Sequence, residues 1–315
     1  MRELQIGAGD SGQRLDKFLK KYLKDASIGF LYKMLRKKNI KLNGKKAEGK
    51  EMLQPGDVVT LYLAEDTIQK FSGREEAVTF PRTKLDIIYE DDHVIFLNKP
   101  AGMLSQKAKK EDVTLVEYLL GYLQEKGKWN PGDTVTPAIC NRLDRNTSGL
   151  VLAGKSLQGL QKMSELLKER SVEKYYLTIV EGTMEKPQKL KGFLQKDEKK
   201  NQIQIYDSPG RDRVPVETHY EPLTGNGSYT LLRVKLITGK THQIRGHLSS
   251  IGHPILGDIK YGGKPVDGQN RQLLHACEII FPVLPEPFTG ISGKVFRAEP
   301  PVNFIKIQQK LFGKR

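Results

Sequence analysis

Residues 141–153 read Asn141-Arg142-Leu143-Asp144-Arg145-Asn146-Thr147-Ser148-Gly149-Leu150-Val151-Leu152-Ala153, a charged turn that leads directly into an apolar segment. The turn places one carboxylate between two guanidiniums, and nearby positive charge favours the ionised form of a carboxyl group. Arginine side chains also bind phosphate in bidentate fashion. The stretch therefore predicts either an acidic catalyst for a polyanion or a surface turn that caps a strand. Local chemistry alone favours the surface turn, because exposed ion pairs are common and contribute little.

The composition is that of a globular chain. Its 315 residues suffice for two domains, and 37% hydrophobic with 28% charged residues is typical of soluble proteins. No segment approaches the length of apolar sequence that a transmembrane helix needs. The first residues lack the apolar core of a signal peptide. We therefore expect a cytoplasmic protein with no membrane partner.

The cysteines and histidines predict no metal site. Cys140 and Cys277 are the only cysteines, no Cys-x-x-Cys pair occurs, and the six histidines form no His-Glu-x-x-His arrangement. Gly239-Lys240-Thr241 is reminiscent of a phosphate-binding loop, but such a loop requires glycine where this chain has Val234. We expect neither a metal ion nor a nucleoside triphosphate site.

Positive charge is concentrated near the N-terminus. The formal net charge is +15, and the isoelectric point is near 9.5. Residues 14–50 hold 13 Lys or Arg against 3 Asp or Glu, a net of +10. A basic surface that served only solubility would be spread more evenly. The distribution therefore indicates a polyanionic partner, most often a nucleic acid.

The same N-terminal segment predicts a small α+β module. Residues 15–23 have apolar side chains at helical spacing, and Ser27 suits the N-cap of a second helix. Asn43-Gly44 is a hairpin-turn signal, and residues 58–63 have the composition of a strand. Four cations occupy the second helix and its end: Lys33, Arg36, Lys37 and Lys38.

This module resembles the S4 domain, a small RNA-binding domain named after a ribosomal small-subunit protein. The resemblance rests on Arg14-Leu15-Asp16-Lys17-Phe18-Leu19, on residues 40–45 and on Pro55-Gly56-Asp57. It implies that residues 1–64 bind RNA and that the four cations of the second helix contact it. An ordinary basic α+β domain without a ligand is the alternative.

The remainder predicts a linker and a second domain. Residues 65–82 are polar, include Ser72-Gly73 and Pro81, and lack sustained periodicity, which is typical of a linker. Helices are expected over 112–127 and 157–169, and strands over 94–97, 174–181, 201–206, 214–220 and 228–237. Because these elements do not alternate as βαβ units, residues 83–315 favour an α+β domain with a largely antiparallel sheet.

Four separated segments of this second domain resemble the RluA-type family of pseudouridine synthases. They are Asn98 to Gly102, Arg142 to Gly149, Lys174 to Gly182, and Gly239 to Arg245, in the family's order and spacing. Further matches follow at Gly252 to Ile255, at Gly257-Asp258 with Tyr261-Gly262, and at Leu274 to Ala276. The resemblance covers residues 83–302. Two positions depart from the family's usual residues. The family often has His at the position of Asn141 and Asp at the position of Asn146.

The resemblance implies an isomerase that needs no cofactor. The reaction breaks the bond between ribose and the uracil nitrogen, and the base rejoins the sugar through carbon 5. It implies Asp144 as the essential carboxylate, either nucleophile or base, with Tyr176 against the extruded base and Arg245 paired with the aspartate. Substrate contacts are implied for three further residues, Arg142, Arg145 and Lys174. Lys99 is expected to support the Asp144 loop, and His242 to be a structural hydrogen-bonder.

The family also implies the partner, which is RNA and above all ribosomal large-subunit RNA. Transfer RNA is the alternative substrate, and a ribosome-assembly factor without catalysis is the alternative class of protein. Binding RNA alone would not require a carboxylate beside a tyrosine and an arginine. Nothing in the sequence indicates an obligate protein partner, so we expect a monomer.

Overall fold

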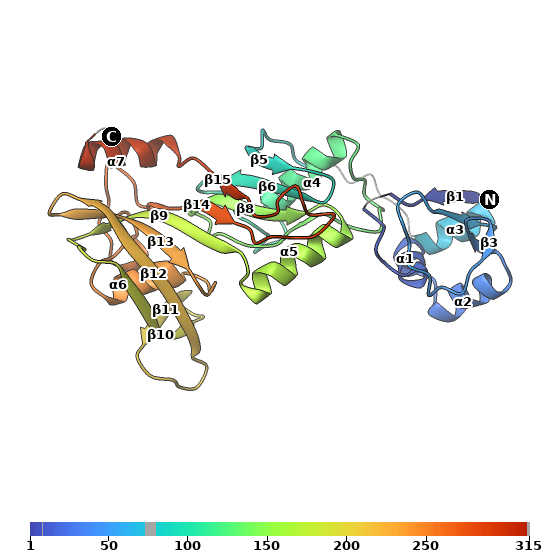
Figure 1. The fold of residues 1–315 in the computed structure, drawn as a ribbon, viewed down its shortest axis with the longest axis horizontal. Coiled ribbons are helices and arrows are strands. Elements are labelled where there is room, and N and C mark those ends of the chain that lie inside the picture. Colours follow the sequence, from blue (N-terminus) through green and yellow to red (C-terminus); the bar gives the residue numbers. More distant parts are fainter. Residues whose placement is uncertain (8, 73–79, 314–315) are drawn as a thin grey trace. The chain divides into compact units, whose positions relative to one another are not determined.

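The computed structural model describes residues 1–7, 9–72 and 80–313, which form two separate β-sheets with helices (Figure 1). The smaller sheet has four strands and the larger has eleven. Every strand pair with a recorded register is antiparallel except one, between β14 (Leu274–Ile280) and β8 (Ser148–Gly154). The predicted α+β class with a largely antiparallel sheet is therefore confirmed.

The small module runs from the N-terminus to residue 72. Its sheet has the order β1-β4-β2-β3. Its elements are β1 (Arg2–Gln5), α1 (Leu15–Tyr22), α2 (Ile28–Arg36), β2 (Ile40–Leu42), β3 (Lys45–Lys46), β4 (Val58–Leu61) and α3 (Glu65–Ser72). As predicted, Ser27 caps α2, and its Oγ accepts a hydrogen bond from the Phe30 N–H at 3.1 Å. Asn43-Gly44 forms the turn between β2 and β3, with both residues at positive φ.

Helix α3 lies where the sequence predicted an irregular linker. That expectation is wrong for residues 65–72, because the fully buried Ile68 and the neighbouring Phe71 pack into the core of the small module. The Asp25 N–H also donates to the Phe71 carbonyl at 3.0 Å. Only two apolar positions anchor this helix, too few for a periodic pattern to stand out. Residues 73–79 of the expected linker lie outside the described residues.

The large sheet has the strand order β11-β10-β12-β13-β9-β14-β8-β6-β5, with β15 beside β14 and β7 beside β8. Its remaining strands are β5 (Ile87–Glu90), β6 (Val94–Lys99), β7 (Ala138–Ile139), β9 (Glu173–Glu181), β10 (Gln188–Asp197), β11 (Gln202–Tyr206), β12 (Val214–Gly225), β13 (Tyr229–Leu236) and β15 (Val295–Arg297). The accompanying helices are α4 (Leu115–Glu125), α5 (Leu157–Glu169), α6 (Gln243–Ser250), the 3₁₀ turn η1 (Ile259–Tyr261) and α7 (Val302–Phe312). None of the helices described here is long and apolar enough to cross a lipid bilayer.

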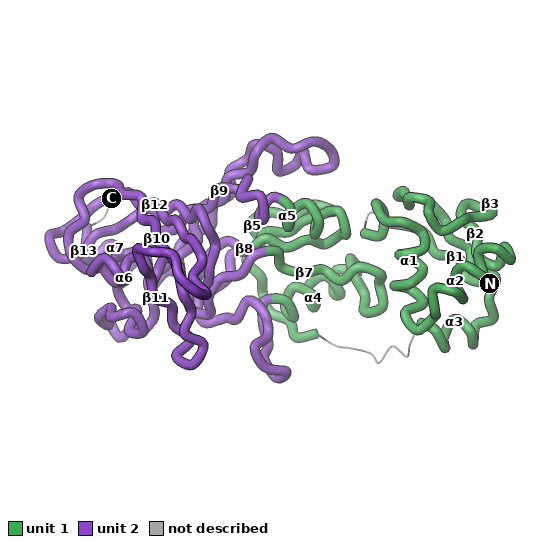
Figure 2. Tube along the Cα trace, turned by 90° about the horizontal axis from the view of Figure 1, so that it is seen from below, with its two compact units in different colours: residues 1–96, 116–140, 152–165 green, residues 97–115, 141–151, 166–315 purple. Residues whose placement is uncertain are grey.

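The chain divides into two compact units (Figure 2). The first comprises residues 1–96, 116–140 and 152–165, and the second comprises 97–115, 141–151 and 166–315. Strands β6 and β8 each begin in one unit and end in the other, so this division does not follow a single point in the sequence. The functional division into residues 1–64, a linker and residues 83–315 stays a proposal. Every candidate catalytic residue lies in the second unit.

The elements absent from the sequence prediction include α6, the helix that carries Arg245. Residues 243–248 are all buried, although they include the polar side chains of Gln243, Arg245 and His247. A helix buried on all sides has no polar face, so its sequence lacks the amphipathic spacing that reveals a surface helix. By contrast α5, which does have that spacing, begins and ends at the predicted residues.

Gly149 fixes how the Asp144 turn joins the sheet. Its φ is +115°, and a Cβ there would lie 2.2 Å from the Ala276 carbonyl oxygen on β14. The Thr147 N–H donates to the Asp144 carbonyl at 3.0 Å, which closes the turn just before β8. Only glycine allows both this backbone conformation and this close approach of two strands.

We predict that Gly149→Ala destabilises the protein by roughly 2–5 kcal/mol, the sum of left-handed strain and overpacking. Urea unfolding followed by near-ultraviolet circular dichroism measures the change. The control is Gly227→Ala in the same unit, at φ +85° with no atom within 4 Å of the added Cβ. The control should lose only roughly 1–2 kcal/mol. Equal losses in the two variants would contradict the packing argument.

Candidate active site

The turn that carries Asp144 is anchored from both sides. On one side, the Leu143 N–H donates to Ser105 Oγ at 3.1 Å, and that hydroxyl donates to the Leu143 carbonyl at 2.7 Å. On the other, the fully buried Lys99 donates through Nζ to the Arg145 carbonyl at 3.2 Å. Lys99 also donates to the carbonyls of Pro100 and Met103, each at 2.9 Å. Lys99 thus supports the Asp144 loop, as expected from the sequence.

Burial lowers the pKa of Lys99 to about 8, and the nearby charge of Asp144 opposes that shift. The ammonium spends its hydrogen bonds on three backbone carbonyls, so it braces the loop without contacting the carboxylate in any recorded hydrogen bond or ion pair. Its position is that of a structural cation rather than an acid in the reaction.

Arg245 on α6 holds the Asp144 carboxylate. Its Nη1 donates to Asp144 Oδ2 at 3.1 Å, so the ion pair expected between these residues is present. The rest of the guanidinium is bound by Asp258, with Nε to Oδ2 at 2.6 Å and Nη2 to Oδ1 at 2.8 Å. The face of Arg245 lies against the Tyr261 ring, 4.8 Å from its centroid. A planar cation held on two edges and one face has little freedom to move.

The electrostatics favour a permanently charged Arg245. Burial acts to lower its pKa, but the hydrogen bonds and charge of Asp258, followed by those of Asp144, raise the pKa above its usual value. The side chains of Arg245 and Asp258 are 6% and 2% exposed, whereas that of Asp144 is 23% exposed. The buried Arg245, held by Asp258, therefore presents its positive charge to the Asp144 carboxylate, which is partly exposed.

Tyr176 lies close to this carboxylate from the middle of the sheet. It is on β9, between Val234 of β13 and Ala276 of β14. Its side chain is buried, and burial followed by the charge of Asp144 raises the pKa of its hydroxyl strongly. The phenol therefore stays protonated at neutral pH. Asp144, Arg245 and Tyr176, far apart in sequence, are brought together in one unit.

The arginines that flank Asp144 in sequence do not pair with it. Arg145 Nε donates to the Gly102 carbonyl at 3.1 Å, and Arg142 is exposed with no hydrogen bond or ion pair to any other described residue. Arg245, and neither of these two arginines, is therefore the ion-pair partner of Asp144. The substrate contacts expected for Arg142 and Arg145 stay a prediction. Lys174 lies two residues before Tyr176 and so shares its face of β9. Burial, then Arg170, lowers the pKa of Lys174.

Two residues join the Asp144 cluster that the sequence did not place there: Asp258 had been given no role, and His242 was expected only to be a structural hydrogen-bonder. Asp258 binds Arg245, and His242 Nε2 lies 3.7 Å from Asp144 Oδ2. The available signal was the family match at Gly257-Asp258 and at Gly239 to Arg245, which marked both positions without indicating their contacts. Within residues 1–7, 9–72 and 80–313, no group of three or more His, Cys, Asp or Glu is placed to hold a metal ion.

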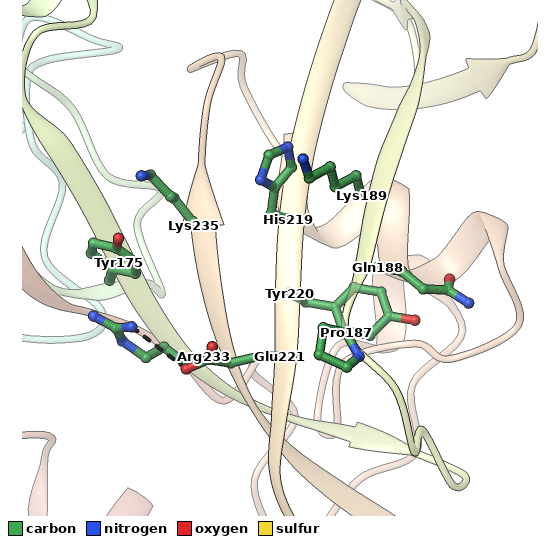
Figure 3. Close-up of a pocket in the computed structure, with 9 residues that line it drawn as sticks. All are labelled: Tyr175, Pro187, Gln188, Lys189, His219, Tyr220, Glu221, Arg233 and Lys235. Atoms are coloured by element: carbon green, nitrogen blue, oxygen red, sulfur yellow. Dashed lines mark hydrogen bonds and ion pairs between the residues drawn. The ribbon is translucent and has the colours of Figure 1, made fainter.

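The opposite face of the same sheet carries a separate shallow pocket of ≈ 330 Å³ (Figure 3). Tyr175 lines it, and successive residues of a strand point to opposite faces, so Tyr176 points away from it. The Arg233 guanidinium lies 3.7 Å from the centroid of the Tyr175 ring and pairs with Glu278 at 2.6 Å and Glu221 at 3.5 Å. Because it lies on the opposite face, the pocket is distinct from the Asp144 cluster. The charged groups of Arg233, Glu221 and Glu278 are paired with one another, so they add no reactive group to that cluster.

Comparison with known proteins identifies the family of this chain. Residues 93–250 match the family described as RNA pseudouridylate synthase, and residues 13–59 match the S4 domain. Ribosomal large subunit pseudouridine synthase C of Escherichia coli strain K12 is 32% identical over 317 residues, which covers 95% of this chain and 92% of that protein. The Vibrio vulnificus protein of the same name is 32% identical over 285 residues, covering 86% and 85%. The chain belongs to the RNA pseudouridylate synthase family and is an RNA pseudouridine synthase, an isomerase with an S4 RNA-binding domain.

Solved structures share the fold. Human RNA pseudouridylate synthase domain-containing protein 4 superposes with a TM-score of 0.59 at 21% identity, covering 72% of this chain and 92% of that one. The human domain-containing protein 1 gives a TM-score of 0.52 at 23% identity, covering 72% and 94%. At these identities the likeness concerns the fold alone.

We predict that Asp258→Asn lowers the free energy of unfolding by roughly 3–5 kcal/mol, because it leaves the buried Arg245 cation with one carboxylate fewer. Chemical denaturation measures the loss. The control is Asp267→Asn, which breaks the exposed pair with Lys310, whose side chain is 64% exposed. That control should cost no more than about 1 kcal/mol. If the two variants were equally stable, Asp258 would not be the anchor of Arg245.

Proposed function

We propose that this enzyme forms pseudouridine in ribosomal large-subunit RNA and that Asp144 is its catalytic carboxylate. The observation that carries the proposal is the Asp258–Arg245–Asp144 chain of ion pairs beside the buried Tyr176. The names of the bacterial relatives, 32% identical over almost the whole chain, support the choice of RNA. Asp144 is the most exposed member of the cluster, as a group that meets a substrate must be.

The proposed roles follow from charge and protonation. Asp144 acts on the ribose or the base, as a nucleophile or as a base, and both roles need an oriented carboxylate. Arg245 supplies that orientation and a constant positive charge. Tyr176 offers an aromatic face for a base and a hydroxyl that keeps its proton. No redox or energy-carrying group is needed, because uridine and pseudouridine are isomers.

The substrate must reach the carboxylate from a folded RNA. Extruding one nucleotide costs a few kcal/mol, and phosphate contacts on either side can offset that cost. Arg142 is exposed and uncommitted to any described residue, which supports a role as a phosphate or base contact in the bound RNA. Lys174 and Arg145 are proposed as further contacts near the same cluster.

The small module supplies a second basic surface on α2. Lys33, Arg36, Lys37 and Lys38 are all exposed, whereas Leu31, Met34 and Leu35 of the same segment are buried in the core. Lys38 has a φ of 63°, which ends the helix. We propose that this surface contacts RNA phosphates and so contributes to affinity and to the choice of site.

We predict that Asp144→Asn lowers the rate of pseudouridine formation by about 10³-fold or more, with RNA affinity nearly unchanged, because the amide keeps the shape and loses the negative charge. The assay follows pseudouridine in large-subunit RNA and, in parallel, in transfer RNA. Asp267→Asn, an exposed aspartate in the same unit, serves as the matched control and should retain full activity.

Two outcomes of this assay would contradict the proposal. Full activity of Asp144→Asn would refute the catalytic assignment. Modification of transfer RNA alone by the wild-type enzyme would refute the proposed substrate while leaving the chemistry in place. Chemical mapping of pseudouridines in cells with and without the gene then identifies the modified uridines.

We predict that replacing Lys33, Arg36, Lys37 and Lys38 together by alanine weakens RNA binding and reduces the salt dependence of the association constant. Each lost phosphate contact should lower the slope of log K against log salt by roughly 0.7–0.9. Filter binding across a salt series measures the slope. The internal control is the turnover rate at saturating RNA, which should not change. An unchanged affinity and an unchanged slope would contradict the proposed role of the small module in RNA recognition.

A further inference from the structure

His242 occupies an unusual position at the start of α6. It has φ 56° and ψ 12°, in the left-handed region, directly before the first residue of the helix. Such a conformation costs of order 1–3 kcal/mol for a residue other than glycine and persists only where the surroundings enforce it. Here Gln243 enforces it, because its Oε1 accepts from Thr238 Oγ1 at 2.8 Å and from the Lys240 N–H at 3.1 Å.

The strained backbone aims the imidazole between two partners. Nδ1 lies 2.9 Å from the Tyr261 hydroxyl, and Nε2 lies 3.7 Å from Asp144 Oδ2. The side chain is only 10% exposed, and the Tyr261 ring meets it edge to face at 5.6 Å between centroids. His242 therefore contacts the carboxylate from within the protein, on the side of the oxygen that Arg245 also holds.

The hydrogen bonds of Tyr261 assign the tautomer of His242. The Tyr261 oxygen accepts from the Ile203 N–H at 2.9 Å, and among the described residues Nδ1 of His242 is the acceptor within reach of the Tyr261 O–H, so we assign that O–H as the donor to Nδ1. A neutral imidazole that accepts at Nδ1 carries its proton on Nε2, the nitrogen that faces Asp144. The series from Ile203 through Tyr261 to His242 then directs an N–H toward Asp144. Burial, with Arg245 and Lys260, lowers the pKa of His242 against the opposing charges of Asp144 and Asp258, which favours this neutral form.

The two oxygens of Asp144 are consequently unequal. Arg245 Nη1 and His242 Nε2 both face Oδ2. Oδ1 receives no hydrogen bond or ion pair from any other residue that the structure describes. A carboxylate gripped at one oxygen presents the other in a defined direction, and orientation of this kind is a large part of catalytic rate enhancement. The contact at 3.7 Å is longer than a hydrogen bond, and catalytic hydrogen bonds are often long in structures without substrate and shorten in the substrate complex.

We propose that His242 is a positioning residue that, together with Arg245, holds Oδ2 of Asp144 and leaves Oδ1 as the reacting oxygen. The inference rests on the proposed role of Asp144 as the catalytic carboxylate. It adds a neutral donor, fixed by Tyr261, to the charged donor already recognised in Arg245. Its effect should appear in the chemical step and not in RNA binding.

Two substitutions of His242 separate orientation from folding. In His242→Asn the side chain tolerates the left-handed backbone and keeps a polar group near Tyr261, but it is too short to reach Asp144. In His242→Gln the amide nitrogen falls near the place of Nε2 and can donate to the carboxylate. We expect the asparagine variant to lose about 10- to 100-fold in single-turnover rate at saturating RNA, with an unchanged dissociation constant. We expect the glutamine variant to recover most of that loss.

Tyr261→Phe provides an independent variant, because it removes the hydroxyl that fixes the tautomer and leaves the ring against Arg245. It should lower the single-turnover rate by less than the asparagine variant does, again without a change in RNA affinity. Thermal melting of each variant accompanies the kinetics. If an unfolded His242 variant prevents the comparison, the rate of Tyr261→Phe decides the question.

The outcomes distinguish this inference from the function on which it rests. Activity in Asp144→Asn would overturn the catalytic assignment itself. With Asp144→Asn inactive, a wild-type rate in His242→Asn would overturn the role of His242. Equal rate losses in the asparagine and glutamine variants, or a loss confined to RNA affinity, would overturn it as well. A loss of single-turnover rate in His242→Asn that is largely absent in His242→Gln supports the inference.

Discussion

The buried guanidinium of Arg245 is the group on which the site depends. It joins Asp258, after the last turn of α6, to Asp144, on the turn before β8. An arginine with this little exposure is stable only when its charge and its N–H groups are satisfied, and two carboxylates with one aromatic face provide this. Removal of Asp258 would leave the buried cation with one carboxylate fewer, and the ion pairs link α6, η1 and the Asp144 turn.

The remaining parts of the site serve to make that arrangement rigid. Lys99 ties the Asp144 turn to the loop after β6, and Gly149 lets β8 approach β14 closely enough for the turn to be seated on the sheet. Gln243 fixes the left-handed residue at the start of α6. The left-handed backbone of His242 directs its imidazole toward the Asp144 carboxylate. Residues that are not proposed to touch the substrate thus hold in place those that are, which is typical of preorganised sites.

Much of the architecture was predictable from periodicity and turn chemistry. The capped helix α2, the Asn43-Gly44 hairpin and helix α5 follow from local rules, since each depends on neighbours in the sequence. Helix α3 and helix α6 were not predictable in this way. The first has only Ile68 and Phe71 as apolar anchors in a short polar segment, and the second is buried on every side and so lacks a polar face.

The sequence by itself determined the class of fold, the basic N-terminal module and the four segments that belong together in a pseudouridine synthase. It also led to Asp144, Tyr176 and Arg245 through the order and spacing of those segments. Only the tertiary structure decided what holds that arginine in place, namely Asp258 and the Tyr261 ring, and that the arginines next to Asp144 do not pair with it. The adjacent Arg142 and Arg145 lie within one residue or two of Asp144 in the chain, yet the partner is Arg245, a hundred residues downstream. Ion pairing depends on where side chains point and on how far water is excluded, and both are set by packing between distant segments.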